Sequence, residues 1–340
     1  MLDVVKCCEE EKRQMILVTG APGHLGNNLV RALLENGETV RCLVLPGERL
    51  DSLKGLDIEI VEGDVRDINS LYRAFDGAEI VYHLASVISL LPGYSDILEE
   101  VNVKGARNVA EACLRTGVRR LVYTSSIHVL VESSNGEVID ESSPCDPKRV
   151  SMSYSKSKAR GTLEVLEVIS KGLDGVVTLP TGIIGPYDYK PSETGRMIID
   201  YVAGKIPVRI SGGYDFVDVR DVAKGHILAA EKGKTGDKYI LSGEWISMDD
   251  VMKEISAITN VPVPRFQLPV GLASAVAYAL TLYSVVTGAK VLMNRDSIST
   301  LRSNSLVSCD KAKRELGYSS RPIRETIRDT VRWFQETGVL

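Results

Sequence analysis

The chain has 340 residues, which is enough for one large domain or two modest ones with a sizeable core. Its net charge of −4, without any basic block, argues against a nucleic-acid-binding protein. The six cysteines show no metal-ligand spacing beyond one adjacent pair, so we expect reduced thiols in a cytoplasmic protein and no metal site. Residues 1–14 are mostly polar, and we expect an N-terminal extension there, not a secretory signal.

The first predicted elements are a strand, a glycine-rich turn and a helix. Residues 15–19 form a short apolar run typical of a buried parallel strand, and residues 27–36 have helical periodicity. The glycines between them allow a tight turn, and a helix N-terminus offers free N–H groups to a pyrophosphate. The segment therefore predicts a dinucleotide site, although its Gly-x-x-Gly-x-x-Gly spacing differs from the commoner fingerprint. The candidate residues are Gly20, Gly23, His24, Leu25 and Gly26.

The end of the second predicted strand, residues 39–45, is where the adenosine ribose would be recognised. An acidic residue there favours NAD, whereas an arginine favours NADP. This chain has Leu45, with Arg49 four residues later and Arg41 inside the strand. Either arginine can equally be a surface charge, so NAD or NADP both stay open, with a slight preference for NADP through Arg49.

Strands and helices keep alternating along the chain. Strands are predicted at residues 58–62, 80–84 and 120–124, and helices at 68–74 and 102–116. Repeated strand–helix units predict an α/β fold with a doubly wound parallel sheet of Rossmann type.

The carboxyl ends of these strands should border the dinucleotide. Asp64 is placed to accept from the adenine amino group, although it can also cap a turn, and His83 is expected to be a packed strand residue. The other candidates at strand ends are Val65, Leu84, Ala85 and Thr124.

A tyrosine and a lysine at helical i and i+4 spacing are the candidate catalytic pair. Tyr154 and Lys158 would share one helix face, and an ammonium beside a phenol should lower the tyrosine pKa from about 10. Such a tyrosine can exchange a proton with an alcohol or a ketone. The hydroxyl of Ser126, just after the fifth strand, could hydrogen-bond the same substrate oxygen.

Taken together and in order, these segments resemble the extended short-chain dehydrogenase/reductase family, also called NAD-dependent epimerase/dehydratases. The likeness runs from about Met15 to the C-terminus. The matching segments are Thr19-Gly20-Ala-Pro-Gly23-His-Leu-Gly26, Gly63-Asp64-Val65, His83-Leu-Ala85, Asn102-Val-Lys-Gly105, Val122-Tyr-Thr-Ser-Ser126, Tyr154-Ser-Lys-Ser-Lys158, Leu179-Pro180-Thr-Gly-Ile-Ile-Gly185-Pro186 and Phe216-Val-Asp-Val-Arg-Asp221-Val-Ala223.

The resemblance implies a role for each matching residue. Tyr154 would be the catalytic acid/base, Lys158 would lower its pKa and hold the nicotinamide ribose, and Ser126 would orient the substrate. Asn102 would lie near the cofactor's ribose or phosphates, and Thr124 and Pro180 would flank the nicotinamide. The chain departs from the family at Leu179, where an arginine often stands, and at Leu45.

The resemblance also implies a second, smaller C-terminal domain that binds the substrate. We expect residues 15–178, with about 213–245, to bind NAD(P), and residues 179–212 and 246–340 to bind substrate. No charged residue lies between Arg265 and Lys290, so that segment is a lid, a core helix or a membrane-contact helix. A membrane span is not favoured, because the segment contains glycine, serine and several alanines.

Our first functional hypothesis is an oxidoreductase acting on a secondary alcohol or ketone of a small, fairly apolar molecule. Tyr214 stands where nucleotide-sugar members of the family usually carry an arginine, which favours the branch of dihydroflavonol reductases and 3β-hydroxysteroid dehydrogenases. The alternatives are a nucleotide-sugar epimerase or dehydratase and, less favoured, a non-catalytic nucleotide-sensing regulator.

We also expect a homodimer, as is common in the family, through the helices at residues 102–116 and 154–170. The second of these helices carries more apolar residues than one packed stripe needs. They are Leu163, Val165, Leu166 and Val168.

Overall fold

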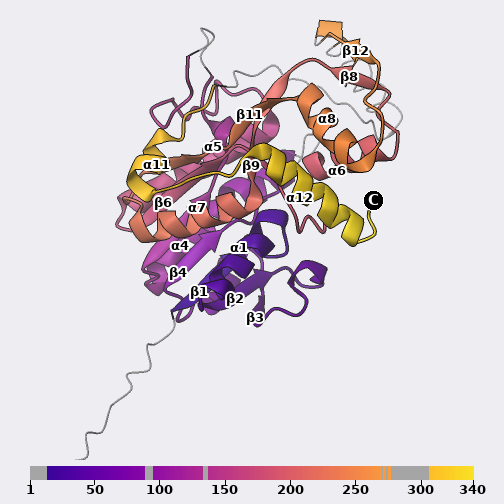
Figure 1. Ribbon diagram of the computed structural model, residues 1–340. Coiled ribbons are helices and arrows are strands. Elements are labelled where there is room, and N and C mark those ends of the chain that lie inside the picture. Colours follow the sequence, from indigo (N-terminus) through magenta and orange to yellow (C-terminus); the bar gives the residue numbers. More distant parts are fainter. Residues whose placement is uncertain (1–13, 89–94, 133–136, 270, 273–274, 277–305) are drawn as a thin grey trace, which may run out of the picture.

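The computed structural model describes most of the chain and shows two joined parts (Figure 1). The described residues are 14–88, 95–132, 137–269, 271–272, 275–276 and 306–340. The predicted extension at residues 1–14 lies almost wholly outside them, as does most of the uncharged segment after Arg265. Within these ranges, none of the helices has the length and hydrophobicity that a membrane span requires.

A seven-stranded sheet in the order β3-β2-β1-β4-β5-β6-β10 forms the centre of the larger part. Every neighbouring pair is parallel, and the order reverses between β1 and β4, which confirms the predicted doubly wound α/β fold. Apart from the edge strand β3, which is mostly exposed, the strands are largely buried on both faces, which explains their apolar runs. They are β1 (Met15–Thr19), β2 (Thr39–Val44), β3 (Glu59–Glu62), β4 (Ile80–His83), β5 (Arg120–Thr124), β6 (Gly175–Pro180) and β10 (Lys238–Leu241).

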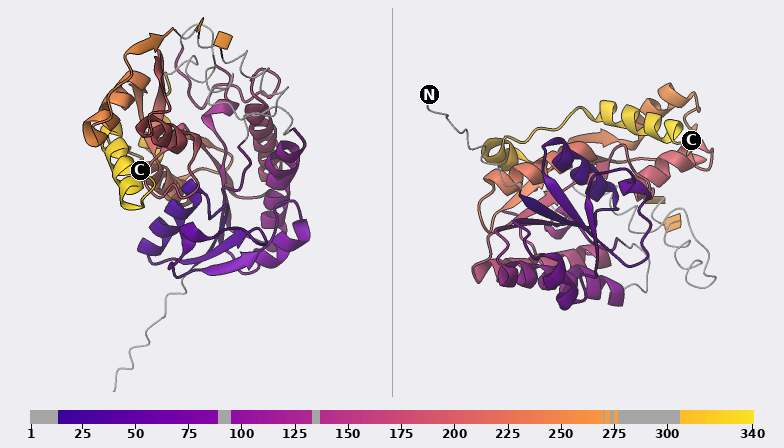
Figure 2. Two further views of the ribbon diagram at one scale, coloured as in Figure 1. Left: turned by 90° about the vertical axis from the view of Figure 1, so that its right-hand side faces the viewer. Right: turned by 90° about the horizontal axis from the view of Figure 1, so that it is seen from below.

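Helices cover both faces of this sheet (Figure 2). One face carries α1 (His24–Glu35), α7 (Val219–Lys232) and α11 (Asp310–Leu316), and α1 packs along α7. The other carries α2 (Ile68–Ala74), α4 (Ala106–Thr116) and α5 (Ser153–Ser170). The short α3 (Ser95–Leu98) and a π-helical segment, η2 (Glu99–Gly105), precede α4, and two 3₁₀ turns are η1 (Asp51–Leu53) and η3 (Ile127–Val129).

The smaller part has its own hydrophobic core, formed by residues such as Tyr201, Val251 and Phe334. Two residues of β9, Tyr214 and Phe216, belong to this second core. Its strands are β7 (Gly182–Ile184), β8 (Val208–Ile210), β9 (Gly213–Asp218), β11 (Glu244–Ser247) and β12 (Phe266–Leu268), and its helices are α6 (Glu193–Val202), α8 (Met248–Thr259) and α12 (Ile323–Glu336).

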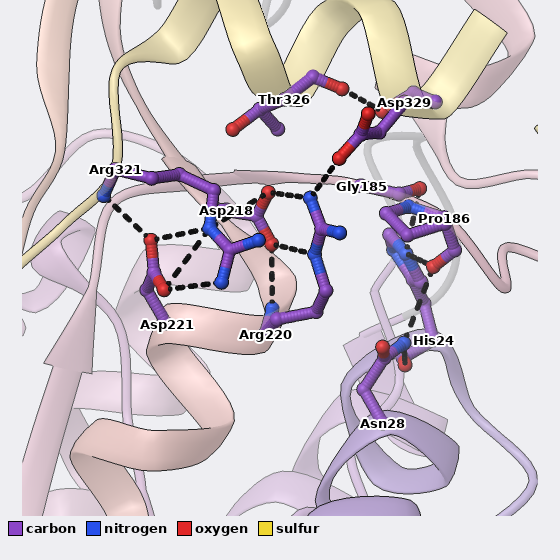
Figure 3. Close-up of polar contacts among 11 residues, drawn as sticks. His24, Asn28, Gly185, Pro186, Asp218, Arg220, Asp221, Arg321, Thr326 and Asp329 are labelled. Atoms are coloured by element: carbon purple, nitrogen blue, oxygen red, sulfur yellow. Dashed lines mark hydrogen bonds and ion pairs between the residues drawn. The ribbon is translucent and has the colours of Figure 1, made fainter. Parts of the chain in front are cut away.

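A cluster of charged side chains ties α7 to the C-terminal segment (Figure 3). Asp218 caps α7 and accepts hydrogen bonds from Arg220, which also donates to Asp329 of α12 at 2.7 Å. Arg321, just before α12, forms a bidentate pair with Asp221. The cluster therefore joins the nucleotide part of the fold to the helix that covers the second core.

Candidate active site

The glycine turn after β1 has the shape that a pyrophosphate requires. Gly20 has φ +71°, and a Cβ there would lie 2.7 Å from the backbone nitrogen of Ala85. A Cβ at Gly26 would collide with the Gly20 carbonyl, whereas one at Gly23 would meet only that carbonyl, at 3.2 Å. Gly23 caps α1 without a side-chain hydrogen bond, and the first turn has no acidic residue. The turn therefore fits a dinucleotide pyrophosphate, which Gly23 and the backbone of His24, Leu25 and Gly26 would hold.

The side chain of His24 points away from that role and toward the second part of the protein (Figure 3). Its Nε2 donates to the carbonyls of Gly185 (3.1 Å) and Pro186 (3.0 Å). Asn28, one turn further along α1, also donates to Pro186. The imidazole thus joins α1 to the loop after β7, so only the backbone of His24 remains for a phosphate.

Several charged side chains surround the end of β2. Arg49 is exposed and pairs with Asp51, while Arg41 is fixed by the carbonyls of Ala74 and Asp76, so Arg41 is not available to a 2′-phosphate. Two residues that the sequence analysis missed lie beside Arg49. The Glu48 carboxylate accepts from the Leu45 N–H at 3.3 Å and pairs with Lys190 at 2.9 Å.

Asp64 and Val65 lie where the sequence placed them, after β3. The Asp64 carboxylate forms a bidentate pair with Arg66. The hydrogen bonds from Arg66 hold the pKa of Asp64 below its usual range. Val65 is buried against Gly105, where a Cβ would be 2.8 Å from its side chain.

The ends of β1 and β4 are joined by a buried hydrogen-bond pair. Thr19 contacts His83 Nδ1 at 2.7 Å and accepts from the backbone N–H of Ala85 at 3.2 Å. Burial, followed by the charge of Lys158, lowers the pKa of His83 to about 3. His83 is therefore a neutral, packed side chain that helps fix the Leu84–Ala85 backbone.

Asn102 lies in the π-helix η2 and uses its whole amide group within the protein. Its Oδ1 accepts from the N–H of Val87 and from Ser86, and its Nδ2 donates to the Val87 carbonyl and to Ser157. π-Helical segments are frequent at functional sites. Here the segment ties the loop after β4 to the helix that carries the candidate catalytic pair.

The candidate catalytic pair lies at the start of α5. Hydrogen bonds with Ser126 and Ser86 lower the pKa of Tyr154, but burial outweighs them and raises it to about 12. Lys158 donates instead to the Thr124 carbonyl at 2.7 Å and lies over the Tyr123 ring. Burial lowers its own pKa to about 7. The predicted fall in the Tyr154 pKa is therefore wrong for the protein alone. Desolvation destabilises the phenolate by more than the nearby hydroxyl dipoles stabilise it.

A second pair of polar rings lies beyond Ser126. The Ser126 hydroxyl accepts from the backbone N–H of His128, and His128 Nε2 lies 2.9 Å from the Tyr214 hydroxyl. Burial lowers the pKa of His128 to about 4, so this imidazole is neutral near pH 7. Burial is the main cause of the raised pKa of Tyr214, with smaller contributions from the charges of Asp215, Glu132 and Tyr154, so Tyr154 lies near enough to interact with this phenol.

The predicted site residues thus fall into two groups. In the first group, Tyr154 interacts with Ser126 and Lys158 binds the Thr124 carbonyl, and buried Pro180 ends the neighbouring strand β6. Arg49 and Asp64 lie at the ends of β2 and β3, on the other side of the glycine turn.

Comparison with known proteins identifies the family. The model of the NAD dependent epimerase/dehydratase family matches residues 16–242. A Synechocystis sp. protein whose name refers to dihydroflavonol 4-reductase is 34% identical over 325 residues, covering 94% of each chain. Sterol demethylase protein B of Methylococcus capsulatus is 34% identical, covering 95% of this chain and 99% of that protein. The crystal structure of gox2253 matches with a TM-score of 0.85 and 35% identity, over 96% of this chain and 100% of that one.

The chain therefore belongs to the NAD-dependent epimerase/dehydratase family, and it is an enzyme of the extended short-chain dehydrogenase/reductase type. The resemblance inferred from the sequence motifs is confirmed.

Proposed function

We propose that this enzyme is an NAD(P)-dependent oxidoreductase that interconverts a secondary alcohol and a ketone on a small, fairly apolar substrate. The observation that carries the proposal is the placement of Tyr154: its phenol interacts with the side chains of Ser126 and Ser86, and Lys158 lies one helical turn away. This arrangement can give a proton to a ketone oxygen or take one from an alcohol.

Each residue contributes a separate part of this chemistry. Bound NAD(P) supplies or accepts the hydride. Tyr154 moves the proton at its hydroxyl, and Ser126 holds the reacting oxygen beside it. The Lys158 ammonium stabilises the phenolate once that form is needed, which offsets part of the burial penalty on Tyr154. Asn102 fixes the Ser86 loop against α5.

The neutral pair of His128 and Tyr214 supports an uncharged substrate. A sugar diphosphate is normally bound by arginines, which form charge-assisted, often bidentate hydrogen bonds. Here a phenol bonded with a neutral imidazole stands near Tyr154, and neither group offers a positive charge. The names of the relatives above refer to a dihydroflavonol and to a sterol, both uncharged ring systems, and support the same class.

A substrate screen tests this proposal. Purified protein with NAD(P)H is offered a panel of cyclic ketones, and the loss of reduced nicotinamide is followed by absorbance. In parallel, UDP- and dTDP-sugars are added at fixed NAD(P), and the melting temperature is recorded. We expect oxidation of NAD(P)H with a ketone and no large thermal shift with the sugars. A large shift with one nucleotide sugar, without net oxidation, would instead support the alternative, an epimerase or dehydratase with transient hydride transfer.

Cofactor choice and cellular location are parts of the same proposal. Arg49 lies just after β2 and pairs with Asp51, and Lys190, in the loop after β7, pairs with Glu48 of the same region. A 2′-phosphate could replace Asp51 as the partner of exposed Arg49, so we keep the slight preference for NADP over NAD. Among the described cysteines, Cys42, Cys113, Cys145 and Cys309 are free thiols, which supports a cytoplasmic location.

A further inference from the structure

A buried histidine on the opposite face of the sheet from α5 is connected to the catalytic lysine. His226 belongs to α7 and is fully buried. Its Nε2 lies 2.8 Å from the Thr124 hydroxyl and 2.9 Å from the Thr178 hydroxyl. Thr124, the last residue of β5, and Thr178, inside β6, are register partners. One imidazole nitrogen thus contacts the side chains of two neighbouring strands.

The hydrogen-bond partners settle the tautomer of His226. Its Nδ1 lies 2.8 Å from the Val222 carbonyl, and because a carbonyl only accepts, Nδ1 carries the proton. Burial lowers the pKa of His226 to about 4, although the bond to Val222 raises it, so the ring is neutral near pH 7. The Nε2 atom is therefore an acceptor, and the Thr124 hydroxyl donates to it. The Thr178 hydroxyl lies 2.9 Å from the same atom and 3.4 Å from the Tyr123 carbonyl, so its single proton is shared between two acceptors.

Thr124 connects this histidine to Lys158. While its side chain is held from the α7 face, its backbone carbonyl accepts the hydrogen bond from the Lys158 ammonium at 2.7 Å. In the described parts of the chain this is the only hydrogen bond that the ammonium donates. The position of the Thr124 carbonyl therefore decides where the ammonium lies relative to Tyr154.

We propose that His226 is a positioning residue for the Tyr154–Lys158 pair: by holding the Thr124 hydroxyl from the far side of the sheet, it fixes the carbonyl that carries the Lys158 ammonium. The effect of His226 on catalysis rests on the proposed function, whereas the hydrogen bonds from His226 through Thr124 to Lys158 are independent of it. His226 touches neither Tyr154 nor Lys158, so it acts only through Thr124.

The consequence for the charge of Lys158 follows from its surroundings. The titratable groups that face it are Tyr154 from its own helix, Tyr123 from β5 and neutral His83 from β4. A hydrogen bond to a carbonyl favours the ammonium over the neutral amine. Loosening the Thr124 carbonyl should therefore lower the pKa of Lys158 further, below about 7.

Two substitutions and two controls test the chain of contacts. His226→Leu removes the acceptor, and Thr124→Val removes the donor but keeps the carbonyl and the side-chain shape. His226→Gln offers an acceptor oxygen and should restore part of the effect. Thr178→Val is the matched control, since it removes the other hydroxyl near Nε2, together with its long bond to the Tyr123 carbonyl, and leaves the Thr124 contact in place. Circular dichroism verifies that each variant is folded.

The first readout does not depend on any substrate. Protein labelled with ¹³C at the lysine ε carbons is titrated by NMR, and the Lys158 signal is assigned with Lys158→Met. We expect His226→Leu and Thr124→Val each to lower the Lys158 pKa by about half a unit or more, and Thr178→Val to leave it unchanged. An unchanged Lys158 titration in folded His226→Leu and Thr124→Val would overturn the proposal, whether or not a substrate has been found.

The second readout is kinetic and uses a substrate from the screen. His226→Leu and Thr124→Val should each lower kcat about tenfold and move the alkaline limb of the pH profile to lower pH, with KM nearly constant. The double variant should be no slower than the slower single variant, because both changes break one connection. If the losses in kcat of the two single variants add up in the double variant, and the alkaline limb of the pH profile does not move, His226 has a merely structural role and the proposal is contradicted. A wild-type protein that turns over no ketone would count against the proposed function alone.

Discussion

The Lys158 ammonium donates its hydrogen bond to the backbone carbonyl of Thr124, at 2.7 Å, and not to the phenol of Tyr154. The lysine is 2% exposed, and burial lowers its pKa to about 7. The unfolded chain, with an ordinary lysine pKa near 10.4, binds more protons than the folded protein between these two values. Lys158 therefore destabilises the cofactor-free protein most at neutral and lower pH, and less as the pH rises toward 10.

Lys158→Met should abolish turnover but raise the free energy of unfolding by about 2 kcal/mol at pH 7, since replacing a buried charge with an apolar side chain of similar volume is often stabilising. The gain should shrink between pH 7 and pH 10. Urea unfolding of the cofactor-free protein at several pH values measures it. Lys156→Met, on the exposed side of the same helix, is the control and should change stability little. A destabilised Lys158→Met protein would show that the ammonium contributes net stability.

The ion cluster around Asp218 gives a prediction with the opposite pH dependence. Burial raises the pKa of Asp218, but the hydrogen bonds and charge of Arg220, with the charge of Arg321, outweigh burial and lower it overall. The resulting stability is present above the unfolded pKa of about 3.9 and is lost as the pH falls through the folded value.

Asp218→Asn should lower the free energy of unfolding by about 3 kcal/mol at pH 7, because it removes a buried carboxylate charge from two partly buried guanidinium groups, Arg220 and Arg321, which keep only Asp329 and Asp221 as partners. The deficit should narrow below pH 4. Chemical denaturation between pH 3 and pH 7 tests this, with the partly exposed Asp329→Asn as the control, for which we expect a loss of less than about 1 kcal/mol. A uniform deficit at every pH would mean that packing, not charge, holds the cluster.

Cofactor choice can be tested at the end of β2. We expect NADPH to bind at least as tightly as NADH, and Arg49→Ala to weaken NADPH about three- to tenfold without changing NADH, because an exposed charge pair contributes up to about 1 kcal/mol. Fluorescence titration of both cofactors measures this, with the distant surface variant Lys171→Ala as the control. A clear preference of the wild type for NADH would contradict the role of Arg49 and indicate that Glu48 recognises the adenosine ribose instead.

Homodimer formation through α4 and α5 stays a prediction, and the structure leaves fewer exposed apolar residues to support it than the sequence suggested. Of the four apolar residues expected to form a second face on α5, Val165 and Val168 are buried and Leu166 packs on the core. Only Leu163, at 43%, is exposed. Light scattering should show a dimer that Leu163→Glu weakens; a monomeric wild type would contradict the prediction.

The sequence predicted the fold and the local elements well, because both depend on local patterns. The apolar run of β5 and the helix over residues 68–74 occur as expected. The glycine turn was recognisable because its backbone geometry excludes other residues.

The sequence could not predict contacts between distant parts of the chain. Nothing near Tyr154 in the sequence points to Ser86, His226 or Tyr214. In the fold, Ser86 interacts with Tyr154, His226 contacts Thr124 and Tyr214 contacts His128. The sign of the Tyr154 pKa was missed for the same reason, since burial is a property of the folded protein and helical spacing alone does not report it. His226 stands three residues after the last matching motif, but its acceptor role depends on Val222 and on Thr124 and Thr178 of two strands.

The most direct test of the account is Tyr154→Phe, which removes one hydroxyl and keeps the ring. The variant should bind NAD(P)H with an affinity within about twofold of the wild type, because the proposed cofactor contacts lie mainly elsewhere, and it should lose turnover of the ketone about a thousandfold. Cofactor fluorescence titration and NAD(P)H oxidation are measured on the same preparation. Retained binding with lost turnover is the result the account predicts; turnover within about tenfold of the wild type would contradict Tyr154 as the proton donor.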